Sequence, residues 1–217
     1  MTDNLTEQSK KIIRNAIIYG ELKLGESISE IGICNKYGLQ KTPVREALII
    51  LSIEGLVKKV RRRGSFVFDI TVKEIEQIAE LRYLLEEFAL KKSFVTNKNE
   101  LLSELNSIYQ KMEVASNTKD YIKYLDLDTE FHRAFFKHCD NDYLKSNYDN
   151  LSSKVEALRF YVVQIAVDSG EGLESHKQII DSIESNDNEQ LSRNLKEHLT
   201  AWLNKYKSDF SLGFFYN

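Results

Sequence analysis

The stretch LQKTPVREAL, residues 39–48, decides the fold of the first part of the chain. Pro43 is the only proline among the 217 residues, and it directly follows Thr42. Threonine as N-cap with proline at the first helical position is a preorganised helix start, because the N–H that proline lacks would have no partner there. Apolar residues then recur at helical spacing and form a stripe for burial: Val44, Ala47, Leu48 and Leu51. We predict a helix capped by Thr42, with Arg45 exposed on its first turn.

Two helices are predicted before this one. Residues 6–19 have apolar side chains at helical spacing, and Gly20 follows as a stop signal. Ser29 is a favourable N-cap for a short helix that ends at Gly38. Two short helices in succession indicate a helix-turn-helix whose second helix suits the major groove of DNA. The exposed side chains at its start are Lys41, Thr42 and Arg45.

A basic hairpin is predicted after the helix pair. Residues 56–60 and 65–68 have the composition of strands. The turn between them consists of Arg61, Arg62, Arg63 and Gly64. A short charge run is more often a solvated loop than a binding site. In this order, however, the hairpin is typical of a wing whose arginines reach phosphates or a minor groove.

The net charge of the chain changes sign after the predicted hairpin. Residues 1–70 carry 12 Lys and Arg against 8 Asp and Glu, whereas the remainder carries 18 against 25. A positive module joined to a larger acidic one is expected if only the first part contacts phosphate. No apolar run approaches the roughly 18 residues of a membrane span. The polar start of the chain and its two cysteines, Cys34 and Cys139, lead us to expect a soluble cytoplasmic protein with no membrane partner.

The remainder of the chain predicts helices only. Helical periodicity divides it into residues 71–95, 98–116, 119–138, 141–168, 173–185 and 188–209. Six antiparallel helices with short connections form a bundle, and the core of a bundle can hold a ligand. The expected fold is therefore mainly α. We place a winged helix-turn-helix in residues 1–69 and a six-helix bundle in residues 70–217.

Two arginines fall within apolar stripes of this bundle. Arg82 lies among Ile75, Ile78, Leu85 and Ala89, and Arg159 lies among Val155, Val162 and Ala166. A guanidinium in such a position needs a partner, because an unpaired buried charge is costly. An internal salt bridge or a snorkelling side chain is the simpler interpretation. A clamp for a carboxylate ligand is the functional one.

The histidines suggest a metal site. Asp128 and His132 are four residues apart and share a helix face. His176 and His198 lie eleven residues on either side of Asp187, so they come level if its polar turn joins antiparallel helices. One carboxylate and three imidazoles suit Zn²⁺ and related divalent metals. Because single histidines are more often ordinary polar residues, spacing alone leaves both interpretations open, and His138 receives no role.

Residues 12–68 resemble the DNA-binding domain of the GntR family. The matching residues form a long ordered series: Gly25, Ser29-Glu30, residues 42–48, Leu51, residues 54–57 and Arg63-Gly64. The resemblance implies that Lys41, Thr42 and Arg45 contact DNA and that residues 61–64 enter the minor groove. Lys41 stands where the family commonly has arginine, which puts bidentate guanine recognition there in doubt. Arg61 replaces a frequent proline and adds charge to the wing.

Residues 72–205 resemble the FCD ligand-binding domain that follows the winged helix in many GntR regulators, and their helix count is closer to the VanR-like branch. The matching residues are Glu80-Leu81-Arg82, Leu85-Glu86, Asp128, Phe131-His132, Asn141, Leu144, His176 and His198-Leu199. The resemblance implies that Asp128, His132, His176 and His198 hold a divalent metal. Zinc is the expected ion, with Ni²⁺ or Mn²⁺ as alternatives. Asn141 is expected to cap its helix.

These features together predict a transcriptional regulator, specifically a repressor. A homodimer would place two recognition helices on a palindromic double-stranded operator. A small carboxylate effector would bind the metal and be clamped by Arg82 or Arg159, and the bundle would change operator affinity. Residues 70–217 would therefore serve both effector binding and dimerisation.

Two alternatives remain at this point. In the first, the metal is structural or is itself the signal, with no organic effector. In the second and less favoured, the chain is a metalloenzyme with an attached DNA-binding domain. A hydrolytic zinc site needs a general base nearby. Glu130 lies two residues from both Asp128 and His132 and points to roughly the opposite helix face, so we expect no enzymatic activity.

Overall fold

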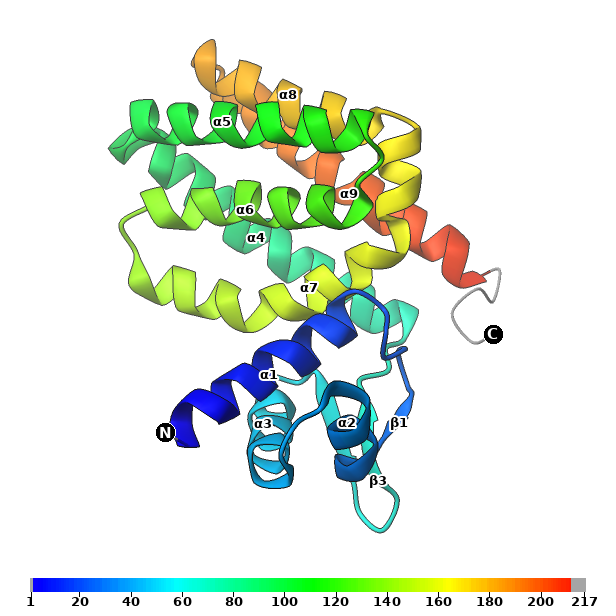
Figure 1. Cartoon of the computed structure of the whole chain (residues 1–217). Coiled ribbons are helices and arrows are strands. Elements are labelled where there is room, and N and C mark those ends of the chain that lie inside the picture. Colours follow the sequence, from blue (N-terminus) through cyan, green and yellow to red (C-terminus); the bar gives the residue numbers. More distant parts are fainter. Residues whose placement is uncertain (1, 212–217) are drawn as a thin grey trace. The chain divides into compact units, whose positions relative to one another are not determined.

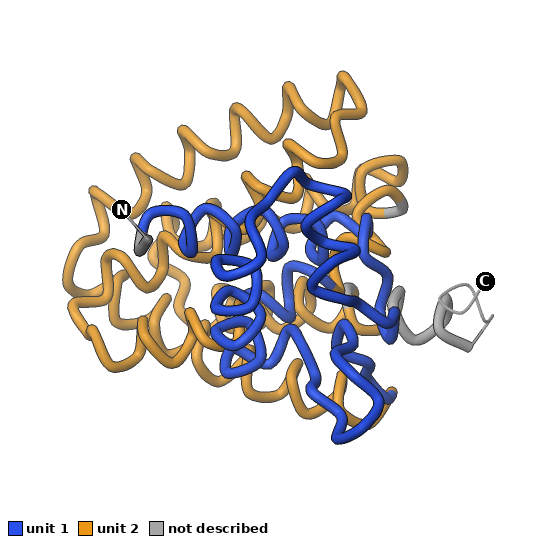
Figure 2. The backbone as a smooth tube through the Cα atoms, turned by 60° about the horizontal axis from the view of Figure 1, so that its bottom comes forward, with its two compact units in different colours: residues 1–71, 153–157 blue, residues 72–152, 158–217 orange. Residues whose placement is uncertain are grey.

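The computed structural model describes residues 2–211, most of them helical (Figure 1). The chain forms two compact units (Figure 2). Unit 1 comprises residues 1–71 with residues 153–157, and unit 2 comprises residues 72–152 and 158–217. None of the helices in the described part of the chain is long and apolar enough to span a membrane.

Unit 1 contains three helices and a small antiparallel sheet. The helices are α1 (Thr2–Ile18), α2 (Glu30–Tyr37) and α3 (Lys41–Ile53). The strands β1 (Ser27–Ile28), β2 (Val57–Val60) and β3 (Gly64–Val67) are ordered β1-β3-β2, and Val60 of β2 pairs with Gly64 of β3. The apolar stripe of α3 is buried as predicted, together with residues of α1 and of the segment entering β2: Ile13, Ile17, Val44, Ala47, Leu48, Leu51 and Leu56. The winged helix-turn-helix is confirmed.

The caps of α2 are as expected, whereas the start of α3 is not. Ser29 caps α2 by accepting a hydrogen bond from the Gly32 amide at 3.0 Å. The prediction that Thr42 caps α3 is wrong, because that helix begins at Lys41 and Gln40 is its N-cap. Pro43 is therefore the third helical residue. It costs no hydrogen bond there, because the first four N–H groups of a helix have no intrahelical partner.

Unit 2 is a bundle of long helices. In chain order these are α4 (Val72–Thr96), α5 (Lys98–Asn117), α6 (Tyr121–His138), α7 (Asp142–Asp168), α8 (Glu171–Glu184) and α9 (Asn188–Ser211). Each lies within a few residues of the range predicted from periodicity. Asn141 accepts a hydrogen bond from the Leu144 amide at 3.0 Å and so caps α7 as expected. Between α8 and α9, Asp187 accepts from the Gln190 amide at 2.8 Å, so the polar turn predicted at this point starts α9.

Candidate DNA-binding surface and metal centre

The predicted DNA-contacting residues lie on the surface of unit 1. Lys41, Thr42 and Arg45 are exposed on the first turns of α3. The Arg45 Nε atom lies 3.2 Å from Glu30 Oε1, in an ion pair that leaves 63% of the arginine side chain accessible. A paired but accessible guanidinium can exchange its carboxylate partner for a phosphate or a base edge.

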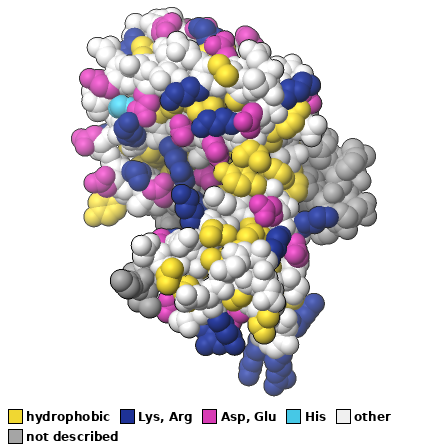
Figure 3. All heavy atoms as spheres, in the orientation of Figure 1, with side chains coloured by type: hydrophobic (Ala, Val, Ile, Leu, Met, Phe, Trp, Pro, Cys, Tyr) yellow, Lys and Arg dark blue, Asp and Glu magenta, His cyan; other side chains and the backbone are white. Residues whose placement is uncertain are grey.

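The arginine turn is also exposed and projects from the sheet. Arg61, Arg62, Arg63 and Gly64 are all exposed, and basic side chains gather at the tip of the β2–β3 hairpin (Figure 3). Arg62 has φ 65° and Gly64 has φ 103°, so two of the four residues have left-handed backbone. This conformation is uncommon for a side chain as large as arginine, and it makes the hairpin turn tight. The wing is therefore short and strongly basic.

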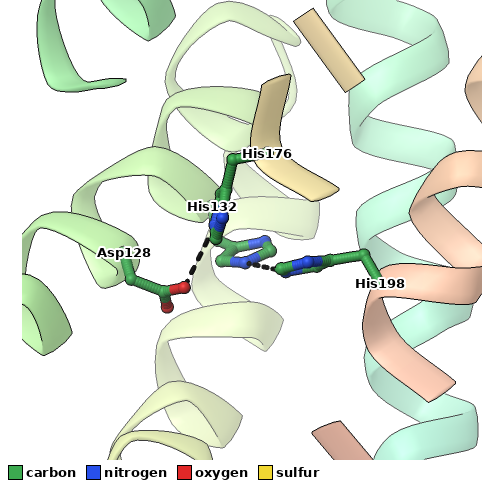
Figure 4. A group of neighbouring side chains, drawn as sticks. All are labelled: Asp128, His132, His176 and His198. Carbon is green, nitrogen blue, oxygen red and sulfur yellow. Dashed lines mark hydrogen bonds and ion pairs between the residues drawn. The ribbon is translucent and has the colours of Figure 1, made fainter. Parts of the chain in front are cut away.

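In unit 2 the predicted metal ligands come together. Asp128 and His132 lie one turn apart on α6, His176 comes from α8, and His198 comes from α9 (Figure 4). One donor atom from each lies within 4.8 Å of the others. The first three residues are buried and His198 is half-buried. The level placement of His176 and His198 around their turn brings their ring centroids to 4.4 Å.

In all three imidazole rings, a hydrogen bond places the proton on Nδ1. The Nδ1 atom of His132 lies 2.7 Å from Glu86 Oε2, and that of His176 lies 2.5 Å from the Gly172 carbonyl oxygen. Both acceptors lack a hydrogen, so each Nδ1 is the donor. The Nδ1 atom of His198 lies 2.8 Å from Ser175 Oγ, whose hydroxyl donates to the same Gly172 carbonyl at 2.9 Å. The Ser175 oxygen therefore accepts from His198.

The consequence is that the three Nε2 atoms carry lone pairs and face other acceptors. His132 Nε2 lies 3.1 Å from His198 Nε2, and His176 Nε2 lies 3.1 Å from Asp128 Oδ1. Burial lowers the pKa of His132, and it lowers the pKa of His176 and His198 well below the usual histidine value, with neighbouring imidazoles adding to the effect. Neutral imidazoles and a carboxylate that present lone pairs to one point match the donor chemistry of a divalent cation.

Behind His132 lies a buried ion pair. Arg82 Nε donates to Glu86 Oε1 at 2.6 Å, and the Tyr148 hydroxyl donates to the same oxygen at 3.2 Å. Burial would raise the pKa of Glu86, but the charges of Arg82 and His132 and their hydrogen bonds lower it to about 2. The internal salt bridge that is the simpler interpretation of Arg82 is therefore present in the structure. Sequence reasoning misses the role of Glu86, although its position four residues after Arg82 on one helix is a signal for the pair.

A cavity of about 700 Å³ adjoins the four-residue cluster. This volume lies within the range of small-molecule sites in proteins. Arg82 and Arg159 both line it, as do Asp128, His176 and His198. Arg159 Nη2 forms an ion pair with Asp128 Oδ2. Because Arg159 is buried beside the cavity, its guanidinium depends on this carboxylate to compensate its charge.

Two other residues of the sequence analysis lie outside the cluster. Glu130, expected on roughly the opposite helix face from Asp128 and His132, is exposed. His138 Nε2 lies 2.7 Å from Glu104 Oε2 and links α6 to α5.

Comparisons with known proteins agree with both units. The profile "Bacterial regulatory proteins, gntR family" matches residues 5–67, and the profile "FCD domain" matches residues 77–201. The gluconate operon transcriptional repressor of Bacillus licheniformis is 26% identical over 191 residues, which span 86% of this chain and 78% of the relative. A probable D-xylose utilization operon transcriptional repressor of Paenarthrobacter nicotinovorans is 25% identical over 199 residues, 92% of this chain and 87% of the relative.

A solved structure shows the same fold. Escherichia coli McbR/YncC superposes with a TM-score of 0.82 at 19% identity, covering 95% of this chain and 98% of that one. The two profiles and these relatives describe transcriptional regulators and not enzymes. The chain therefore belongs to the FCD-domain family and is a transcriptional regulator of the GntR type, with a winged helix-turn-helix for DNA in front of the FCD bundle.

Proposed function

We propose that this regulator is a repressor whose operator affinity responds to a small organic acid, bound beside a divalent metal in the FCD bundle. Asp128, His132, His176 and His198 would hold the ion, which is expected to be zinc, with Ni²⁺ or Mn²⁺ as alternatives. The single observation that carries the proposal is the convergence of three Nε2 lone pairs and a carboxylate on one buried point. The match of residues 77–201 to the FCD domain supports the same assignment, because the resemblance to that domain implies a divalent metal at these four positions.

The adjoining cavity supports an organic effector. A bound divalent ion supplies a positive centre that attracts a carboxylate. Arg159 lies on the same cavity wall, and a ligand carboxylate could replace Asp128 as its partner. Arg82 lines the cavity while bonded to Glu86, so it adds positive potential. Because one relative is named for gluconate, sugar acids are the first effectors to test.

We assign operator binding to residues 1–69. Effector binding and dimerisation are assigned to residues 70–217. The accessible basic residues of α3 and the β2–β3 turn support binding to a palindromic operator by a homodimer. Support for a dimer comes from α4, which exposes Leu81, Leu84, Phe88 and Val95 along one face. Such a stripe marks an interaction site when it is contiguous.

The alternative with a metal alone, structural or signalling, shares the same ligand cluster. The cavity beside the cluster favours the organic effector, because a purely structural site needs no adjoining space.

The test is a thermal-shift screen of zinc-loaded protein against small hydroxy, keto, sugar and amino acids. An acid that stabilises the protein only when metal is present supports the proposal, since a ligand at 100 times its Kd adds about 2.7 kcal/mol. EDTA-treated protein is the control for metal dependence. His176→Ala should abolish the zinc-dependent shift, whereas His138→Ala, outside the cluster, should retain it. Stabilisation by zinc with no response to any acid would favour the metal-only alternative.

A further inference from the structure

Tyr124 has a position in the site that the metal cluster does not explain. It lies on α6 one turn before Asp128, as His132 lies one turn after, so the three residues share a helix face. The side chain is 2% exposed and lines the cavity. Among the residues that the structure describes, its hydroxyl has no hydrogen-bond partner. A buried hydroxyl without a partner loses its bonds to water and gains none in return, so its position needs a reason.

Gly172 leaves the space into which this hydroxyl projects. A Cβ atom added at Gly172 would lie 2.7 Å from the Tyr124 hydroxyl oxygen and 3.2 Å from the Ala166 carbonyl oxygen. No larger residue is therefore accommodated without displacing the tyrosine. The carbonyl of the same glycine holds the Nδ1 atom of His176. The Tyr124 hydroxyl thus lies next to the backbone that orients a metal ligand.

The chemistry of the cavity wall indicates what this hydroxyl recognises. Burial raises the pKa of Tyr124, so the phenol remains protonated and can both donate and accept. Glu174 and Glu197 line the same cavity and disfavour a second anionic group on the ligand. Leu125 and Val162 contribute apolar surface to it. A neutral polar group on a ligand with a single carboxylate matches this combination.

We infer that Tyr124 determines effector specificity by hydrogen bonding to a hydroxyl group of a monocarboxylic acid. The inference rests on the proposed function, because the acid's carboxylate is placed at the metal and Arg159. It names the effector class more narrowly: a hydroxylated acid with one carboxylate. A site built to bond a hydroxyl discriminates strongly against the analogue that lacks it, since its own polar group is then left unpaired.

The experiment compares a hydroxylated acid with its deoxy analogue by calorimetric titration of zinc-loaded protein. Gluconate and hexanoate form the first pair, because both have six carbons and one carboxylate. We expect Tyr124→Phe to weaken gluconate binding at least tenfold and to change hexanoate binding less than twofold. Zinc affinity should stay at the wild-type value, and the melting temperature without acid should stay the same or rise, because the variant removes a buried hydroxyl that has no partner in the described part of the chain. A merely structural role of Tyr124 would instead lower the melting temperature. Tyr143→Phe is the matched control, since Tyr143 is 83% exposed.

Three results would overturn the inference. The first is equal affinity of wild type for hydroxylated and deoxy acids. The second is a Tyr124→Phe protein that binds gluconate as wild type does, and the third is a variant that weakens both acids equally. Failure of the proposed function is seen separately and earlier, as wild-type protein that binds zinc but no acid.

Discussion

At the residue scale, Glu86 connects Arg82, which lines the cavity, to His132 of the four-residue cluster. One carboxylate oxygen accepts from Arg82 and the other accepts from His132. The first bond keeps the glutamate ionised in a buried place, and the second fixes which nitrogen of His132 carries the proton. A carboxylate behind a ligating histidine orients the ring and raises its basicity as a ligand. In the proposed metal site, Glu86 would therefore be a positioning residue and not a ligand itself.

We predict that Glu86→Gln lowers zinc affinity by about 10–100-fold, the range typical of partners behind metal ligands. The amide is nearly isosteric but neutral, so it holds the His132 ring less firmly and also weakens the bond to Arg82. The measurement is a competition titration with a chromophoric chelator, on protein whose circular dichroism matches wild type. Glu87→Gln is the control on the adjacent position, where the carboxylate pairs with Lys91 near the surface. Equal zinc affinities of wild type and Glu86→Gln would contradict the positioning role.

The sequence predicts some residues of the site and misses others for a physical reason. Helix geometry predicts that the four residues lie near one another, because Asp128 and His132 are one turn apart and the two later histidines are equidistant from a turn, whereas their role as metal ligands is implied by the resemblance to the FCD domain. The contact of Glu86 with His132 depends on packing between α4 and α6, and the role of Tyr124 depends on the cavity wall, neither of which helical periodicity predicts. The error at Thr42 arises because its capping preference is only a weak energy, which an earlier start at Lys41 overrides.

At the scale of elements, we predict that the β2–β3 hairpin has an electrostatic role in DNA binding. Its three exposed arginines should release counterions when they bind DNA phosphates. Replacing Arg61, Arg62 and Arg63 together by glutamine should reduce the slope of log K against log salt by about 1 for each phosphate that the wing no longer neutralises. Fluorescence anisotropy on a random-sequence duplex measures this without knowledge of the operator. The triple lysine variant keeps the charge and should keep the slope; an unchanged slope in the glutamine variant would exclude phosphate binding by the wing.

A second element-scale prediction concerns the link between α5 and α6. Glu104 accepts from Lys137 at 2.9 and 2.8 Å and lies 2.7 Å from His138 Nε2. Burial opposes ionisation of Glu104, but these two partners outweigh it and lower its pKa. A carboxyl pKa lowered by folding stabilises the protein above the unfolded-state pKa, and this stabilisation disappears as the pH falls through the folded-state pKa.

Glu104→Gln should therefore reduce the free energy of unfolding by about 1 kcal/mol at pH 7, a magnitude typical of partly exposed charged pairs. The difference in free energy of unfolding between the variant and wild type should shrink towards zero at about pH 3, well below the ordinary pKa of a glutamate side chain. Urea titrations at the two pH values measure it. Glu100→Gln, exposed one turn earlier on α5, is the control. A deficit of equal size at both pH values would show that packing and not charge is responsible.

The elements of the bundle are predictable because long amphipathic helices carry a repeated signal. Their six ranges agree with the structure to within a few residues. The sequence does not predict the strand β1. It has only two residues, Ser27 and Ile28, and it exists through pairing with Phe66 and Ser65 far along the chain. Such non-local pairing leaves no local pattern, so a short strand of this kind is found only in the folded structure.

At the scale of the whole molecule, the sequence changes from net basic to net acidic after residue 70, and the first compact unit of the structure comprises residues 1–71 together with residues 153–157. That division is visible in the sequence because charge is a sum over many residues and does not depend on local geometry. Assembly is different, since it depends on which apolar side chains remain exposed after folding. Leu81, Leu84, Phe88 and Val95 have helical spacing like any core stripe, and only the structure shows that they remain on the surface of α4.

We predict that wild-type protein has about twice the 25.2 kDa mass of one chain in solution and that Leu84→Glu reduces it to the mass of one chain. Leu84 is 63% exposed in the middle of the stripe, so a glutamate there costs the folded chain little but places a charge inside the proposed interface. Size-exclusion chromatography with light scattering measures the mass. Val114→Glu on α5 is the matched control, because Val114 is 64% exposed and lies outside the stripe. The monomeric variant should also bind a palindromic operator more weakly, since its two recognition helices no longer bind simultaneously. A Leu84→Glu protein that remains dimeric at the same concentration would place the dimer interface elsewhere on the chain.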